Sequence, residues 1–144
     1  MPNDFILHRL DNQTLIEVAN KLPRSGILIR DGDYAFLKIS EDYIEKLFPL
    51  LEGHEKLYKP LYPAHISLIY PEEECYVSDS DVGSLHSFEL LDLYTTQLFG
   101  KHGWLMTVSA PSLEQLRKKY NLPKKLCYKG HRIVFHITIA QDML

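Results

Sequence analysis

The segment Ala64-His65-Ile66-Ser67-Leu68-Ile69-Tyr70 decides how the fold is interpreted, because it places a histidine and a serine inside an apolar run. Pro63 precedes it and Pro71 follows it, and an apolar run bounded by prolines indicates a β-strand. Side chains alternate between the two faces of a strand, so His65 and Ser67 point the same way. The opposite face is expected to carry Ile66, Leu68 and Tyr70.

A second segment, Phe135-His136-Ile137-Thr138-Ile139-Ala140, repeats this pattern 71 positions later, near the end of a predicted strand Arg132–Ala140. By the same alternation, His136 and Thr138 share one face. Each of the two strands therefore presents an imidazole and a hydroxyl side by side and buries an apolar face. One such pair is a weak signal, whereas two copies in one chain point to a shared role.

The paired pattern fits the chemistry of phosphodiester cleavage. This reaction needs one group to remove a proton from the attacking oxygen and another to protonate the leaving oxygen. Histidine titrates near neutral pH, so one neutral and one protonated imidazole can do both. The hydroxyl two residues further on can donate a hydrogen bond to a phosphate oxygen, where negative charge builds in the transition state.

The remaining strands and loops are read from turn signals. Asp31-Gly32-Asp33 between two apolar runs predicts a β-hairpin. The polar, turn-rich segment Glu72–Leu85 is predicted to be a loop. Further strands are expected at Gly26–Arg30, Tyr34–Ile39, Phe88–Phe99 and Trp104–Ser109.

Three helices are expected between these strands. The first begins after the N-cap Asp11 and ends before Pro23, and the second follows Ser40 and is shortened near Pro49. The third opens at Pro111, with Ser112 and Gln115 spaced as a capping box. Helices that alternate with hairpins predict an α+β fold with antiparallel sheet rather than a doubly wound parallel one.

Length and composition limit the function classes. The chain has 144 residues, which suits one domain over residues 1–144, and its 45% apolar and 24% charged residues are ordinary globular values. A formal charge of −3 argues against binding bulk duplex nucleic acid through its phosphates. No signal peptide and no membrane span are predicted. With only Cys75 and Cys127, we expect a reduced, cytoplasmic, monomeric protein.

The paired His65-Ile66-Ser67 and His136-Ile137-Thr138 resemble the two signature motifs of the 2H (two-histidine, LigT-like) phosphoesterase superfamily. The resemblance implies a bilobal fold, with two pseudo-symmetric lobes of antiparallel sheet and flanking helices around a central cleft. It implies that His65 and His136 are the acid–base pair and that Ser67 and Thr138 bind phosphate. It also implies substrates such as 2′,3′-cyclic phosphates, 2′,5′-oligoadenylates or cyclic oligonucleotides, cleaved without metal or other cofactor. Which histidine is the acid stays open.

Four other residues are possible substrate contacts. Tyr62 lies outside the first strand and is a candidate for stacking on a nucleobase. Trp104 is a second stacking candidate, with a cross-strand core position as the alternative. Lys129 and Arg132 lie in a basic stretch before the second motif and are candidates for phosphate contact, with a solvated loop as the alternative.

Two other function classes remain open. One is a nucleotide- or RNA-binding module on the same fold that has lost catalysis, which predicts binding without turnover. The other is an interaction domain in which both histidine faces are merely solvated, which predicts that the two motifs lie far apart. A metal site is not expected, because the sequence has no HxH, HExxH or CxxC motif.

Overall fold

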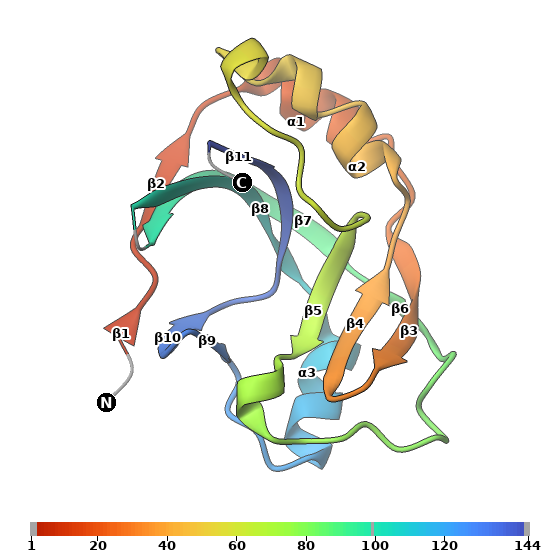
Figure 1. Ribbon diagram of the computed structural model, residues 1–144. Coiled ribbons are helices and arrows are strands. Elements are labelled where there is room, and N and C mark those ends of the chain that lie inside the picture. The colour runs from red at the N-terminus through yellow and green to blue at the C-terminus, as the bar shows by residue number, and fades with distance from the viewer. Residues whose placement is uncertain (1–2, 99, 143–144) are drawn as a thin grey trace.

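Figure 1 shows the computed structural model of the chain, in which residues 3–98 and 100–142 are described. The prediction of an α+β fold with a large antiparallel sheet is confirmed. The eight strands of this sheet lie in the order β2-β7-β8-β11-β5-β4-β3-β6, and each neighbouring pair is antiparallel. Strands from the middle and the end of the chain therefore meet at the centre of the sheet.

In chain order the eight strands are β2 (Leu7–Leu10), β3 (Ser25–Asp31), β4 (Tyr34–Lys38), β5 (His65–Ile69), β6 (Leu85–Ser87), β7 (Glu89–Leu98), β8 (Lys101–Ser109) and β11 (His136–Gln141). Six of these strands overlap predicted segments, whereas no strand was predicted at Leu7–Leu10 or Leu85–Ser87, and β8 begins three residues before the predicted Trp104. The expected hairpin is present, since Asp31 pairs with Tyr34 across the turn and Gly32 adopts a φ of 62°. The predicted end of the β7 segment, Phe99, lies outside the described residues.

A small second sheet corrects one prediction. It contains β1 (Asn3–Asp4), β10 (His131–Ile133) and β9 (Leu126–Tyr128), with β10 in the middle. The single strand predicted at Arg132–Ala140 is therefore wrong: β10 and β11 belong to different sheets, and a bend at Phe135 separates them. The apolar run continues across the bend, so the sequence carries no local signal for the break. In Figure 1 the small sheet lies inside the curve of the large one.

The three helices differ from expectation mainly at their first residues. In α1 (Gln13–Ala19) the N-cap is Asn12, whose Oδ1 accepts a hydrogen bond from the Leu15 N–H at 3.1 Å, and not the predicted Asp11. α2 spans only Asp42–Glu45.

α3 (Pro111–Lys119) begins after Ala110, and no side chain caps it. The predicted capping box is absent because Ser112 lies inside the first turn, where its hydroxyl is hydrogen-bonded to His86 Nδ1 at 2.8 Å. Short 3₁₀ turns complete the chain at Phe48–Leu50, His54–Lys56 and Pro71–Glu73. Among the described helices none has the length and apolar character needed to cross a membrane.

One hydrophobic core joins the helices to one face of the large sheet. Ile66 of β5 and Ile137 of β11 are both fully buried in it, together with side chains of all three helices. Figure 1 shows α1 and α2 together at one end of the molecule and α3 towards the other end. The helices therefore cover the sides of both motif strands that carry Ile66 and Ile137.

Candidate active site

The two motif strands are direct neighbours. β5 and β11 pair antiparallel, with Ile66 opposite Ile137. Paired residues of an antiparallel ladder point to the same face, and both isoleucines enter the core. The residues on either side of them must point to the opposite face, which we call the histidine face. It carries His65, Ser67, His136 and Thr138.

The register also determines which of these residues face one another. Counting one residue either way from the isoleucine pair puts His65 across from Thr138 and Ser67 across from His136. Cβ atoms directly across a ladder are about 5 Å apart, and diagonal neighbours are about 7–8 Å apart. The two histidines are diagonal neighbours. The register thus places both imidazoles on the same face of two neighbouring strands.

Both imidazoles are oriented in the same way. The Nδ1 of His65 lies 2.7 Å from the carbonyl oxygen of Pro63, and the Nδ1 of His136 lies 2.9 Å from that of Val134. A carbonyl oxygen can only accept, so each Nδ1 carries a hydrogen. Each Nε2 is then the nitrogen that gains or loses a proton. The two-residue offset between the histidine and its acceptor is identical in both motifs.

His136 is held in its neutral form. Burial lowers the pKa of His136 to about 4, against an ordinary value of 6.5, the hydrogen bond to Val134 opposes this shift, and the charge of His65 adds to it. Because the two imidazoles repel when both are charged, protonation of one disfavours protonation of the other. Near neutral pH His136 is therefore uncharged, and the two imidazoles are not both charged at once.

A bulge in β5 brings a tyrosine to the histidine face. Ser67 pairs with Phe36 of β4, whereas the next pair is Ile69 with Ala35, so Leu68 is the extra residue. The bulge breaks the alternation that predicted Tyr70 on the same face as Leu68. The Tyr70 ring instead stacks on Tyr34 with centroids 5.9 Å apart.

β11 bulges at the corresponding place. Thr138 pairs with Leu105 of β8 and Ala140 pairs with Trp104, so Ile139 is the extra residue. Gln141 then returns to the face of Thr138, five residues after its histidine, as Tyr70 is after His65. Its Nε2 is buried and has no hydrogen-bond partner among the described residues.

Ser67 has a partner that the sequence analysis missed. Ser67 is only 4% exposed, and its Oγ lies 2.7 Å from the phenolic oxygen of Tyr34. Burial raises the pKa of Tyr34 to about 12, so this phenol stays a neutral hydrogen-bond donor. The alternation along β4 places Tyr34, Phe36 and Lys38 on one face. The sequence could therefore show that these three side chains lie together, but not that they lie beside Ser67.

A comparison with protein-family models gives the family. Residues 35–143 match the model of the "Swiss Army Knife" 2H phosphoesterase domain, which is more than half of the chain. The chain belongs to the 2H phosphoesterase family. Comparisons with curated proteins and with solved structures returned no significant match. The matched residues of this 2H phosphoesterase include both motifs, so phosphodiester cleavage is its general activity class.

The structure places the four further predicted substrate contacts of the 2H phosphoesterase in three different regions. Tyr62 is 73% exposed. Burial is the largest cause of the raised pKa of Tyr34, the Ser67 hydrogen bond opposes it, and Tyr128 and then Tyr62 add smaller increases. Trp104 pairs with the buried Ala140 and lines a hollow on the helix-covered side of the sheet. That position does not bring its ring to the histidine face.

Lys129 and Arg132 belong to the region of the small sheet. The backbone N–H of Lys129 donates to Glu72, and an Arg132 guanidinium nitrogen lies 3.4 Å from the Lys125 carbonyl oxygen. The first contact anchors the turn between β9 and β10, and the second joins β10 to the residue before β9. They do not themselves link either residue to His65 or His136.

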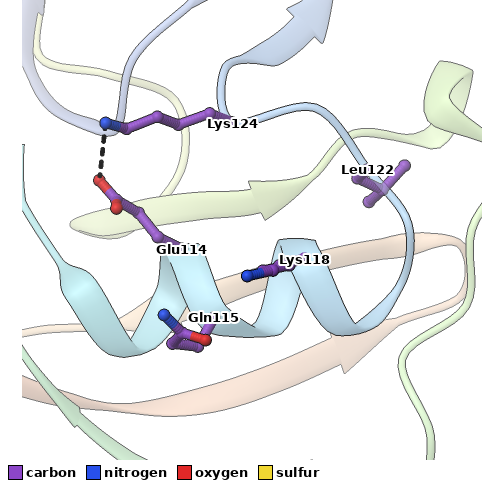
Figure 2. Close-up of a pocket in the computed structure, with 5 residues that line it drawn as sticks. All are labelled: Glu114, Gln115, Lys118, Leu122 and Lys124. Atoms are coloured by element: carbon purple, nitrogen blue, oxygen red, sulfur yellow. Dashed lines mark ion pairs between the residues drawn. The ribbon is translucent and has the colours of Figure 1, made fainter.

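Other surface features of the 2H phosphoesterase lie away from the motifs. Figure 2 shows a hollow along α3, bordered by an ion pair of Glu114 with Lys124 at 3.9 Å. The loop 72–85 contacts α3 through an ion pair between Asp81 of the loop and Lys119 of the helix, at 2.8 Å. Within residues 3–98 and 100–142, no three His, Cys, Asp or Glu side chains gather into a possible metal site.

Proposed function

We propose that the protein cleaves a nucleotide phosphodiester by metal-independent two-histidine acid–base catalysis. The substrate is a 2′,3′-cyclic phosphate, a 2′,5′-oligoadenylate or a cyclic oligonucleotide. The observation that carries the proposal is the pairing of Ile66 with Ile137, which turns both histidine–hydroxyl pairs to one face. Two pseudo-symmetric lobes in one domain, and a cleft between them, remain predictions.

The two histidines divide the proton transfers. In the ring-opening version, water attacks phosphorus and passes a proton to one Nε2, while the P–O bond to the ribose breaks and the other Nε2–H protonates the leaving oxygen. In the 2′,5′ version a ribose hydroxyl takes the place of water and leaves a cyclic phosphate. The lowered pKa of His136 favours it as the histidine that begins neutral and accepts the proton. His65 is then the proton donor.

Ser67 and Thr138 are proposed to donate hydrogen bonds to the non-bridging phosphate oxygens. Each hydroxyl residue lies across the ladder from the histidine of the other motif. The two histidines and the two hydroxyl residues therefore occupy opposite corners of a four-residue patch. Such donors contribute most when negative charge grows on those oxygens. Tyr62, exposed beside Tyr34, is the proposed stacking contact for a base.

A nucleotide-binding module without turnover is the second candidate. It is favoured by one observation, the burial of Ser67 beneath Tyr34, because a phosphate donor must reach its ligand. Binding of a nucleotide with no product from any linkage would support this second candidate over the enzyme.

The test is turnover of 2′,3′-cyclic nucleotides, 2′,5′-oligoadenylates and cyclic dinucleotides, with and without EDTA. His65→Ala and His136→Ala are each expected to lower the rate by roughly 10²–10⁴-fold, the usual contribution of a positioned acid or base. His8→Ala, at an exposed position on β2, is the matched control and should behave like wild type. Full inhibition by EDTA, or normal turnover by His136→Ala, would contradict the proposal.

A further inference from the structure

A lysine on the strand next to β5 lies directly across from the first histidine. The ladder between β4 and β5 pairs Lys38 with His65. Residues so paired share a face and have Cβ atoms about 5 Å apart. Together with Thr138 on the other side of His65, this gives a row of three side chains across β4, β5 and β11.

The burial pattern of β4 agrees with this orientation. Lys38 is exposed, whereas the residues before and after it, Leu37 and Ile39, are buried in the core at 0% and 6% exposure. Phe36, two residues earlier on the outward side, meets His65 edge-on with ring centroids 5.6 Å apart. The outward side chains of β4 therefore extend over the histidine face.

The charge of Lys38 is uncompensated. Within residues 3–98 and 100–142, Lys38 forms no ion pair, whereas five other lysines do: Lys46, Lys59, Lys119, Lys124 and Lys125. The whole chain has a formal charge of −3, so an anionic substrate gains nothing from the overall charge. An unpaired cation on the histidine face supplies a local attraction for a phosphodiester.

We propose that Lys38 binds the scissile phosphate through its ammonium group, which rests on the phosphodiesterase function proposed above. Its three N–H donors form charge-assisted hydrogen bonds to the non-bridging oxygens. These oxygens gain negative charge as the nucleophile adds, so the contact is stronger in the transition state than in the bound substrate. Lys38 thereby lowers the barrier as well as contributing to binding.

The test compares Lys38→Met, which keeps the length of the side chain and removes its charge, with Lys38→Arg. Lys118→Met, at an exposed position on α3, is the matched control. One readout is kcat/KM on the substrate that the wild type cleaves. The second is the affinity for inorganic phosphate by calorimetry, which needs no turnover. Thermal melting checks that each variant is folded.

Lys38→Met is expected to lower kcat/KM and phosphate affinity by roughly 10- to 100-fold, the range for hydrogen bonds to charged groups. Lys38→Arg should recover part of both, and Lys118→Met should change neither. Equal phosphate affinity in Lys38→Met and wild type, including the case in which neither binds, overturns the role of Lys38. Full activity in His65→Ala and His136→Ala would instead overturn the proposed function, so the two failures are distinguishable.

Discussion

Arg117 of α3 and Glu73 in the turn after β5 form a buried ion pair, with 2.6 Å between Nη2 and Oε2. Arg117 also donates a hydrogen bond to the carbonyl oxygen of Leu68, the bulge residue, at 2.8 Å. Glu73 accepts one from the backbone N–H of Tyr70 at 3.1 Å. The ion pair therefore holds the backbone at the bulge residue itself and two residues after it.

Glu73→Gln should destabilise the protein strongly. Removal of one partner leaves the Arg117 charge buried and uncompensated, which costs about 3–5 kcal/mol of unfolding free energy. Urea denaturation measures this cost. Glu114→Gln is the control, because its pair with Lys124 at 3.9 Å is more exposed and is expected to contribute less than about 1 kcal/mol. Equal effects of the two variants would contradict the assigned importance of the buried pair.

Tyr34→Phe should lower activity with little change in fold. Either hydroxyl of the Tyr34–Ser67 pair can be the donor. In the proposed site the Ser67 hydrogen is directed at the phosphate, which requires Tyr34 to donate to Ser67. Loss of a hydrogen bond of about 1 kcal/mol predicts a kcat lower by roughly fivefold to tenfold. Tyr43→Phe is the control, since its phenol donates to the Pro23 carbonyl oxygen at 2.7 Å, away from the motifs. That variant should lose stability and keep its kcat.

The pH dependence of stability should report on His136. Its folded pKa of about 4 lies below the ordinary 6.5, so the unfolded chain binds more protons between these values. Stability should therefore fall as pH drops from about 6.5 to 4, by up to about 3 kcal/mol from this residue. Urea unfolding at several pH values measures the fall, and His136→Asn should reduce it. An NMR titration of His136 near pH 6.5 would contradict the assignment.

Gln141→Leu should stabilise the free protein. The buried Nε2 of Gln141 has no hydrogen-bond partner among the described residues, and an unsatisfied buried donor costs about 1–3 kcal/mol. Replacement by leucine, of similar size, removes that cost. We expect the unfolding free energy to rise by about 1 kcal/mol in urea denaturation. A fall of similar size would show that the amide does have a partner.

Two groups of site residues differ in how far the sequence could predict them. His65 with Ser67, and His136 with Thr138, could be assigned to shared faces because the alternation along a strand is local. Tyr34, Lys38 and Gln141 were missed. Their places depend on which strands pair, in which register, and where the ladder bulges.

The boundaries of the strands show the same division. The hairpin at Asp31–Tyr34 was predicted correctly, since an Asp-Gly turn acts within a few residues. The break between β10 and β11 was not, because the apolar run 133–140 continues through it. What separates the two strands is their partners: β10 pairs with β1 and β9, and β11 pairs with β5 and β8.

By itself, the sequence determined two amphipathic strands, each with an imidazole and a hydroxyl on its polar side, because the side-chain period of a strand depends only on its own backbone. Only the tertiary structure decided that these strands are adjacent and antiparallel, with Ile66 against Ile137. It also decided that a bulge follows each motif and that Lys38 stands beside His65. Register and bulges arise from hydrogen bonds between distant segments, and no local pattern specifies them.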